Sequence, residues 1–456
     1  MPNTIVALAT PTGRSGIGVI RLSGDSALMI AGMLVGHGDF SPLPRSAILK
    51  QINDPATGEA IDDAIVTYFK APNSFTGEDV IEISCHGSPV LLRQVIDICL
   101  SLDARMADPG EFTLRALANG RMNLAEAEAI RDLIDAQTTA SARQAIRQLQ
   151  GEFSKQLQPL KDDLLNVIVV LESALEFVED DLPEMQAENI KVRLTEIAAE
   201  TARLAATFKA GRLIREGLRV ALVGRPNVGK SSLFNALLGS DRAIVTEIAG
   251  TTRDQIHERF TINGIPISLI DTAGLRETMD TVESIGVERS RATMADADLV
   301  VVMLDASEQF CDADAKILLD VSDIDHLIAA NKNDKVTVHQ VDLLKAKIEN
   351  QKSRVISVSA KTGAGLEELK SAIVQPFLPQ DITNTGFLVT DARHHDLLVR
   401  ANGEIEQSLN QMKQRLSEEI VLIALHNALR YLGQITGETT TEDMLTRIFS
   451  TFCIGK

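Results

Sequence analysis

The chain has 456 residues, of which 45% are hydrophobic and 24% charged, and a formal net charge of −18. These values are typical of a globular protein with about three domains, each large enough for its own core. The acidic balance excludes generic electrostatic attraction to nucleic acid, so an RNA substrate needs a local basic patch or a basic partner. Four scattered cysteines, no apolar run of membrane-spanning length and no basic leader predict a reduced, cytoplasmic protein without a membrane span.

Residues 1–119 are predicted to form an α+β domain. Alternating apolar runs bounded by turn residues predict strands, and one segment has helical spacing. The strands are expected at 5–9, 18–22, 64–69 and 80–84, and the helix at 90–102. Cys85 and His86 follow the last of these strands without further metal-ligand residues beside them, so a packed strand end is the preferred interpretation.

Long helical stretches dominate residues 120–215 and return in 379–456. Their expected positions are 124–149, 157–177, 187–208, 392–416 and 419–432. Neither block closes a core by itself. The two ends of a nucleotide-binding α/β domain lie at its surface and often close together. We therefore expect residues 216–378 to be such a domain, inserted into one helical domain built from both flanks; two independent bundles are the alternative.

The segment 224–231 reads Gly-Arg-Pro-Asn-Val-Gly-Lys-Ser and lies between a predicted strand at 218–223 and a predicted helix at 232–238. Its glycines let successive backbone N–H groups point at the phosphates of a nucleotide, where the helix dipole favours anions. Lys230 then reaches the β- and γ-phosphates, and the Ser231 hydroxyl ligates Mg²⁺. The nucleotide contacts expected in this region are Asn227, Val228, Gly229, Lys230, Ser231 and Ser232.

Three further loops follow in order, each directly after an apolar strand expected at 265–270, 326–330 or 355–358. In the first, Asp271 holds the Mg²⁺ shell and the Gly274 N–H meets the γ-phosphate. The second reads Asn331-Lys332-Asn333-Asp334, and its last carboxylate accepts from N1–H and N2–H of guanine but repels N1 of adenine. The third, Ser359-Ala360-Lys361, offers a backbone N–H to guanine O6. This order of phosphate, metal and base elements predicts a Ras-like P-loop GTPase domain that uses GTP and Mg²⁺.

The hydrolytic machinery departs from that of small signalling GTPases, because Leu275 stands where they carry a water-orienting glutamine. Thr251-Thr252 is the expected first switch, with the Thr252 hydroxyl closing on Mg²⁺. The Asn227 amide oxygen suggests a K⁺ ligand between the phosphates; the alternative is an asparagine that caps a turn. Arg253 and Arg276 are either charge stabilisers or ordinary solvent-facing arginines.

Four sequence blocks outside the nucleotide motifs are similar to blocks of a known protein family. They are Gly-Glu-Asp-Val-Ile-Glu-Ile-Ser-Cys-His-Gly at 77–87, Pro-Gly-Glu-Phe-Thr-Leu-Arg-Ala at 109–116, Asn-Gly-Arg-Met-Asn-Leu at 119–124 and Phe-Cys-Ile-Gly-Lys at 452–456. With the inserted GTPase domain, they resemble the MnmE/TrmE family of tRNA-modification GTPases from residue 5 to the last residue. Ser88 replaces a glycine common in the family, which is a loop change.

The resemblance implies a homodimer whose N-terminal domain (1–119) also mediates dimerisation and binds a tetrahydrofolate one-carbon donor, 5-formyl- or methylene-tetrahydrofolate. The folate contacts that it implies are Arg21, Glu82, Arg121 and Lys456. It further implies a heterotetramer with the FAD protein MnmG. Together they add a carboxymethylaminomethyl or aminomethyl group to C5 of the wobble uridine of certain tRNAs. The resemblance also implies that GTP hydrolysis is potassium-activated and coupled to dimerisation of the GTPase domains.

Two residues are candidates for catalysis. Glu283 matches the family glutamate that positions the attacking water indirectly, whereas an exposed glutamate in a loop is commonly only a solvated charge. The Cys453 thiol is a nucleophile or proton donor near the folate site, or a cysteine packed at a helical end. For the whole chain there are two alternatives. One is a GTPase that acts as an assembly factor or switch without substrate chemistry. The other is a folate-binding scaffold in which GTP turnover only times the association with a partner.

Overall fold

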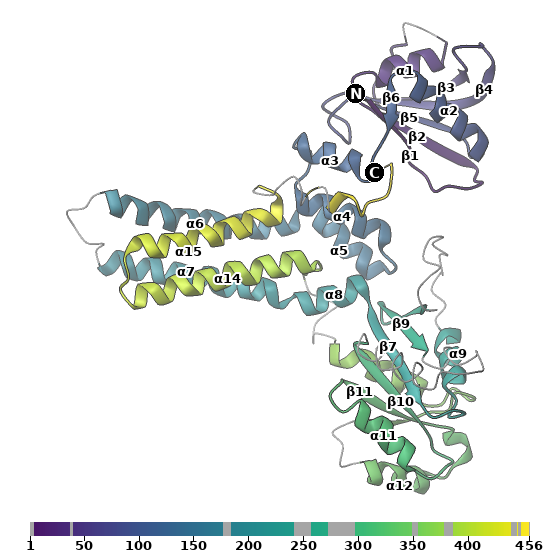
Figure 1. The fold of residues 1–456 in the computed structure, drawn as a ribbon, viewed down its shortest axis with the longest axis vertical. Coiled ribbons are helices and arrows are strands. Elements are labelled where there is room, and N and C mark those ends of the chain that lie inside the picture. Colours follow the sequence, from purple (N-terminus) through teal and green to yellow (C-terminus); the bar gives the residue numbers. More distant parts are fainter. Residues whose placement is uncertain are drawn as a thin grey trace, which may run out of the picture. The chain divides into compact units, whose positions relative to one another are not determined.

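The computed structural model describes residues 4–36, 40–176, 184–240, 257–271, 297–348, 354–377, 386–438, 445 and 448–455. The described chain forms two compact units (Figure 1). The first unit contains Met1–Asp135, Ala145–Ala198 and Arg400–Lys456, and the second contains Ala136–Gln144 and Ala199–Val399. The predicted fold class, an α+β N-terminal part, a helical part and a P-loop α/β part, is confirmed.

The N-terminal sheet of the first unit has the strand order β3-β4-β5-β2-β1-β6, in which only the β1–β6 pair is parallel. Its elements are β1 (Thr4–Leu8), β2 (Ile17–Ser23), α1 (Ala27–Leu34), β3 (Ala47–Asn53), β4 (Ala60–Phe69), β5 (Val80–His86), α2 (Pro89–Ser101), β6 (Ala104–Met106) and α3 (Glu111–Ala118). Alternating residues such as Ile20, Leu22, Ile81 and Ile83 are buried with the apolar residues of α1 and α2. All four predicted strands and the predicted helix are present; β3, β6, α1 and α3 were not predicted.

The end of β5 differs in part from the expectation of a packed strand end. Cys85 is buried, and burial raises the pKa of its thiol to about 12. His86, however, is exposed, and its Nδ1 lies 2.7 Å from Oδ1 of the Asp62 carboxylate. The alternation of a half-buried strand explains the difference, because consecutive side chains point to opposite faces of the sheet.

The helices of the first unit include the antiparallel pair α6 (Glu152–Glu176) and α15 (Glu418–Thr436), in which Lys161 pairs with Glu438 and Glu172 with His426. The other helices are α4 (Leu124–Asp135), α5 (Thr139–Leu149), α7 (Glu184–Ala206) and α14 (Ala392–Lys413), the last three shared with the second unit. The predicted stretch 124–149 is two helices, because Thr138 and Ser141 exchange backbone-to-hydroxyl hydrogen bonds of 3.1 Å that begin a new helix. Phe449 and Phe452 of the C-terminal tail pack on Leu124.

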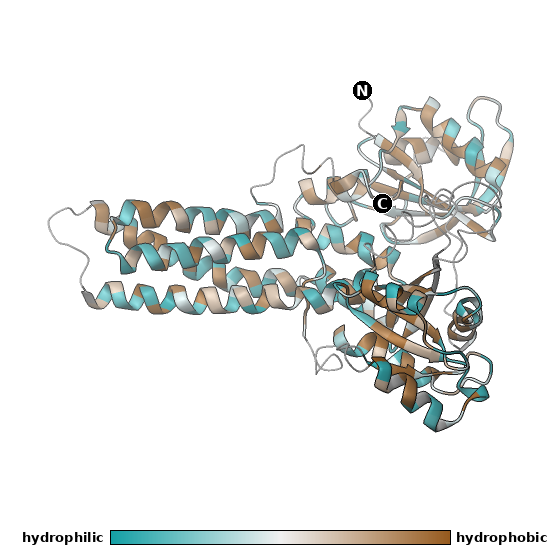
Figure 2. Cartoon of the chain, turned by 60° about the horizontal axis from the view of Figure 1, so that its bottom comes forward, coloured by the Kyte–Doolittle hydropathy of each residue, from teal (hydrophilic) through white to brown (hydrophobic). Residues whose placement is uncertain are grey.

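The second unit contains a sheet of order β12-β11-β10-β7-β9-β8, which is parallel except for the β8–β9 hairpin. Its elements are α8 (Phe208–Glu216), β7 (Leu218–Gly224), α9 (Lys230–Ser240), β8 (His257–Ile262), β9 (Ile265–Asp271), β10 (Leu299–Asp305), α11 (Asp312–Asp320), β11 (His326–Asn331), η2 (Asn333–Lys335), α12 (Val338–Ile348), β12 (Val355–Ser357), α13 (Leu366–Val374) and η3 (Gln375–Phe377). Both faces of this sheet are covered by apolar clusters, as a parallel sheet requires, and hydrophobic residues follow its strands in Figure 2.

Candidate functional site

The phosphate-binding loop joins β7 to α9, at the carboxyl ends of the parallel strands, where α/β sheets bind their ligands. Asn227 and Gly229 both have positive φ, 65° and 98°. The Lys230 ammonium donates to the carbonyl oxygens of Gly224 and Arg225, each at 2.8 Å, so it lies across the loop. Ser231 and Ser232 are exposed in the first turn of α9. The loop therefore has the compact form that its sequence predicts for binding phosphate.

Asn331, at the end of β11, joins the phosphate loop to the third predicted loop. Its side chain is buried; Nδ2 donates to the Val228 carbonyl oxygen at 2.8 Å, and Oδ1 accepts from the Ala360 backbone N–H at 3.0 Å. A β-carbon on Gly229 would lie 2.4 Å from Asn331 Nδ2, so any other residue at this positive φ would displace the Asn331 side chain. The sequence predicted these residues in three separate motifs, and the structure brings them into contact.

Asp334 is exposed at the same edge of the sheet, and Ser359 Oγ donates to its Oδ1 at 2.6 Å. This hydrogen bond holds the pKa of Asp334 below its usual range, aided by the nearby positive charges of Lys361 and Lys335. The carboxylate is therefore ionised at neutral pH, the form that accepts two hydrogen bonds from a guanine base. The arrangement fits the predicted base-specificity loop.

Two acidic residues outside the predicted motifs, Asp305 and Asp314, contact residues of the nucleotide loops. Asp305, the last residue of β10, accepts from Lys332. Asp314 of α11 accepts from Arg225 of the phosphate loop. Sequence reasoning missed Asp305, although a carboxylate at the end of a strand as buried as β10 marks the ligand edge of a parallel sheet.

Several predicted residues cannot be placed in this site. Asp271 ends β9 and pairs in register with Leu222, but its side chain is outside the described part of the structure. Thr251, Thr252, Gly274 and Glu283 also lie outside the described residues, as does Lys456. Their roles stay predictions.

Comparison with known proteins decides the family. The family described as GTP-binding protein TrmE N-terminus matches residues 4–121, and that described as MnmE helical domain matches residues 124–453. The tRNA modification GTPase MnmE of Koribacter versatilis (strain Ellin345) is 44% identical over 460 residues, and that of Aquifex aeolicus (strain VF5) is 42% identical over 460 residues; each alignment covers 100% of both chains. The chain belongs to the MnmE family of tRNA modification GTPases. The resemblance seen in the sequence is thus confirmed, and the protein is a GTPase.

In this MnmE-family chain, Arg21 is the centre of a second polar site, on the N-terminal sheet. Its Nε and Nη2 donate to Glu82 Oε1 at 2.9 and 2.7 Å, and Nη1 donates to the Gly455 carbonyl oxygen at 3.3 Å. The guanidinium carbon lies 5.7 Å from the ring centroids of both Phe75 and Phe112. Arg21, Glu82 and the C-terminal tail therefore meet at this sheet. Arg121 is exposed after α3, and we find no contact between it and Arg21 among the described residues.

The C-terminal tail of the MnmE-family chain reaches this sheet through its backbone. The Gly110 N–H donates to the Cys453 carbonyl oxygen at 3.4 Å, and the Cys453 side chain is exposed. A β-carbon on Gly455 would lie 2.5 Å from the Leu8 carbonyl oxygen, which shows how closely the tail approaches β1. An exposed thiol remains chemically accessible, whereas Cys85 and Cys99 are buried with pKa values raised to about 12.

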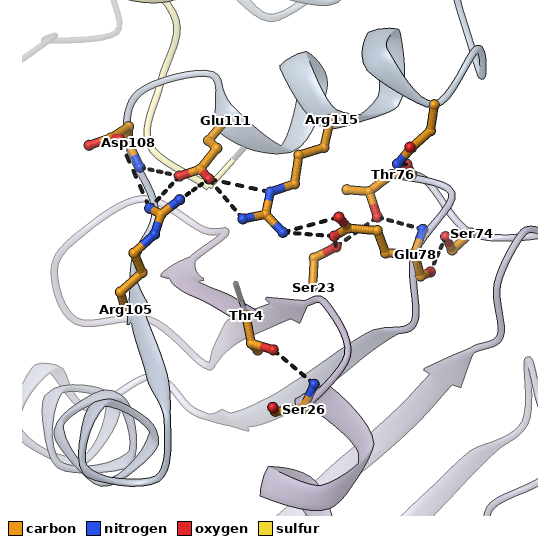
Figure 3. Close-up of polar contacts among 11 residues, drawn as sticks. Thr4, Ser23, Ser26, Ser74, Thr76, Glu78, Arg105, Asp108, Glu111 and Arg115 are labelled. Carbon is orange, nitrogen blue, oxygen red and sulfur yellow. Dashed lines mark hydrogen bonds and ion pairs between the residues drawn. The ribbon is translucent and has the colours of Figure 1, made fainter. Parts of the chain in front are cut away.

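A charged network beside this site was not anticipated from the sequence (Figure 3). Arg115 donates from Nη1 to both Glu78 oxygens, at 3.1 and 2.9 Å, and from Nη2 to Glu111 Oε1 at 2.9 Å. Glu111 also accepts from Arg105 and from the Asp108 backbone N–H. Burial alone would raise the pKa of Glu111, but these donors outweigh it and lower the pKa. The network fixes the start of α3 and, through Gly110, the place where the tail binds.

Proposed function

We propose that this protein hydrolyses GTP to drive modification of C5 of the wobble uridine of certain tRNAs, in complex with the FAD protein MnmG. The added group is carboxymethylaminomethyl or aminomethyl, built with a one-carbon unit from tetrahydrofolate. The observation that carries the proposal is the full-length similarity to MnmE proteins, named as tRNA modification GTPases, together with the convergence of three of the four nucleotide loops at one sheet edge.

The residues of the phosphate loop have distinct roles in this proposal. Backbone N–H groups around Gly229 and the Lys230 ammonium bind the phosphates, and Ser231 with Thr252 holds Mg²⁺. An ion held by Ser231 and Thr252 would supply positive charge that offsets the negative charge of the phosphates. The exposed Ser231 hydroxyl in the first turn of α9 suits that ion. Asp334 selects guanine. Glu283 orients the attacking water indirectly, because Leu275 stands where small signalling GTPases carry the water-orienting glutamine.

We assign K⁺ to the Asn227 side chain. The Asn227 carbonyl oxygen accepts from Lys332 Nζ at 3.0 Å, and the side-chain amide oxygen is the other oxygen of this residue that can ligate an ion. The alternative, an asparagine that caps a turn, requires a local hydrogen bond from Asn227 Oδ1. The Asn227 side chain is exposed at the loop, where an ion can reach it.

For the one-carbon chemistry, Arg21 and Glu82 are placed to bind the pterin or glutamate part of tetrahydrofolate, with Arg121 and Lys456 as further contacts. The half-buried ring of Phe75 beside the Arg21 guanidinium adds an apolar surface suited to a flat ring system. Cys453 acts there as nucleophile or proton donor; its exposed thiol and the nearby Gly455–Arg21 hydrogen bond support this role.

We also propose a homodimer formed through the N-terminal sheet. Leu49 and Ile65 are register partners on β3 and β4 and are 70% and 44% exposed, and Ile17 on β2 is 62% exposed. A second copy would remove this apolar surface from water. Because the chain is strongly acidic, MnmG is expected to supply much of the positive charge that tRNA binding needs.

The domain arrangement that goes with this function is a GTPase domain, 216–378, inserted between the two halves of a helical domain, 120–215 and 379–456. The second unit supports this arrangement at the junction: α8 leads into β7, and the Val389 N–H of the returning chain donates to Thr207 Oγ1 at 3.0 Å. Entry to and exit from the GTPase domain are therefore side by side.

The deciding experiment is steady-state GTP hydrolysis in potassium chloride and in sodium chloride at equal ionic strength, for the wild type, Asn227→Ala and Asn235→Ala. A cation opposite the developing charge is worth about 10³–10⁵ in rate in GTPases with an arginine finger, so we expect strong potassium activation. It should be lost in Asn227→Ala and kept in the control, because Asn235 is exposed on α9 away from the loop. Equal wild-type rates in the two salts would refute the potassium role and direct attention to Arg253, Arg276 or a partner protein.

A further inference from the structure

Asp305 is a buried carboxylate that the proposed function does not use. It is 4% exposed at the end of β10, where its Oδ1 accepts from the backbone N–H of Ser307 at 2.9 Å and from the Ser307 hydroxyl at 2.6 Å. Its Oδ2 accepts from Lys332 Nζ at 2.5 Å. Burial would raise the pKa of Asp305, but the bonds from Lys332 and Ser307 outweigh it and lower the pKa. The carboxylate is thus ionised, fixed and aimed at one lysine.

Lys332 connects this carboxylate to the phosphate loop. The same ammonium group donates to the Asn227 carbonyl oxygen at 3.0 Å. Lys332 and Asn227 both have φ of 65°, a left-handed conformation that asparagine tolerates but that is uncommon for lysine. One lysine side chain therefore spans from the base-binding loop to the phosphate loop, and Asp305 determines where its charge lies.

The segment after β10 contacts the phosphate loop a second time. Arg225 donates from Nε to Asp314 Oδ1 at 2.6 Å and from Nη2 to Glu308 Oε2 at 3.1 Å. Asp314 is buried and accepts from the Cys311 N–H at the start of α11. Residues 305–314 thus reach the phosphate loop at two positions, at Asn227 through Lys332 and directly at Arg225.

We propose that Asp305 is a positioning residue for guanine nucleotide binding, which holds the Lys332 ammonium on the Asn227 carbonyl so that the base loop and the phosphate loop are preorganised for one nucleotide. The proposal rests on the proposed function of this site. A free lysine side chain samples many rotamers, and fixing it before the ligand arrives reduces the entropy lost on binding. A carboxylate does this better than a neutral group, because a charge-assisted hydrogen bond is about twice as strong.

The test is a double-mutant cycle in the full-length protein, with GDP affinity measured by calorimetry for Asp305→Asn, Lys332→Met and the double variant. The effects of substitutions at two contacting residues commonly depart from additivity by a factor of about 2 to 150 in the equilibrium constant. We therefore expect Asp305→Asn to weaken GDP binding about tenfold. In the Lys332→Met background the same substitution should cost nothing further. Full additivity of the two losses would overturn the proposal, because a carboxylate that only stabilises the fold acts whether or not Lys332 is present.

Two further variants keep the test decisive. Asp312→Asn removes the same charge from an exposed position in the first turn of α11 and should leave GDP affinity unchanged. Should Asp305→Asn fail to fold, Ser307→Ala removes only one hydroxyl bond to Asp305; a loss of affinity that vanishes with Lys332→Met supports the proposal, and no loss overturns it. A wild type that prefers ADP to GDP would instead refute the guanine site itself, an outcome distinct from the failure of Asp305 alone.

Discussion

Gly229 shows how little freedom a single position in the nucleotide site has. Its φ is 98°, and an added β-carbon would lie 2.4 Å from Asn331 Nδ2. We predict that Gly229→Ala displaces the Asn331 side chain from the Val228 carbonyl oxygen. The strain and the lost hydrogen bond together cost about 1–3 kcal/mol, so GDP affinity should fall by about 5-fold to 150-fold. Isothermal calorimetry with GDP measures this directly.

Gly239 provides the matched control for that substitution. It lies near the end of α9 with nothing within 4 Å of an added β-carbon. Gly239→Ala should therefore keep wild-type GDP affinity and stabilise the helix by up to about 1 kcal/mol. Wild-type affinity in Gly229→Ala would show that the loop relaxes around the methyl group and that Asn331 does not fix its shape.

At the scale of elements, the chain returning from the GTPase domain is fastened to α8 before it enters α14. Gly211 of α8 has no room for a β-carbon, which would lie 2.1 Å from the Val389 carbonyl oxygen. Arg215 donates to Asp391 Oδ2 at 2.7 Å, and the Arg393 N–H donates to Asp391 Oδ1 at 2.8 Å. Burial would raise the pKa of Asp391, but the charges of His394 and Arg215 outweigh it and hold the pKa well below its usual range.

This ion pair predicts a pH dependence. Because the folded pKa of Asp391 is lowered, its contribution to stability is complete above the unfolded pKa of about 3.9 and is lost as pH falls toward the folded pKa. Asp391→Asn keeps an acceptor for the Arg393 N–H but removes the largely buried carboxylate that pairs with Arg215. We expect a loss of about 3 kcal/mol at neutral pH, which shrinks below about pH 4. Denaturant unfolding of both proteins from pH 3 to pH 8 measures the difference.

The comparison for Asp391→Asn is Asp323→Asn, which removes the same charge from an exposed position in the second unit. It should change the free energy of unfolding by less than about 0.5 kcal/mol. If Asp391→Asn were as stable as Asp323→Asn at pH 7, backbone contacts and not charge would hold the segment before α14 against α8.

The elements also show what sequence patterns can and cannot predict. Strands with strict alternation, such as β2 and β5, and the motif-bearing edge of the second sheet were predicted from local residues. The edge strand β3 was not, because only Ile52 of its seven residues is buried and its apolar residues do not mark one face consistently. Asp305 and the Arg115 network were missed for a related reason: each depends on partners that are distant in sequence, 27 residues away for Lys332 and 37 for Glu78. Local periodicity contains no information about such pairs.

At the scale of the whole molecule, the first unit is assembled from three separate stretches of chain and is completed by the last residues. Phe449 and Phe452 are 2% and 6% exposed, where they pack on α4. Gly110 at the start of α3 has no room for a side chain, because Phe449 and Phe452 atoms would lie within 3.1 Å of its β-carbon. The tail therefore contributes to the hydrophobic core of the first unit, in addition to presenting Cys453.

Two units with separate cores predict two unfolding transitions that respond to different changes. The nucleotide site lies in the second unit, so GDP should increase the free energy of unfolding of that unit by RT ln(1 + [L]/Kd), about 2.7 kcal/mol at a hundredfold excess over Kd. The unfolding transition of the first unit should not move. Phe452→Ala should destabilise only the first unit, by about 3 kcal/mol, as removal of a buried ring does. Ile454→Ala, at a side chain 53% exposed, is the control and should move neither. Differential scanning calorimetry with and without GDP resolves the two, and a single transition that both GDP and Phe452→Ala shift would mean that the tail and the nucleotide site belong to one cooperative structure.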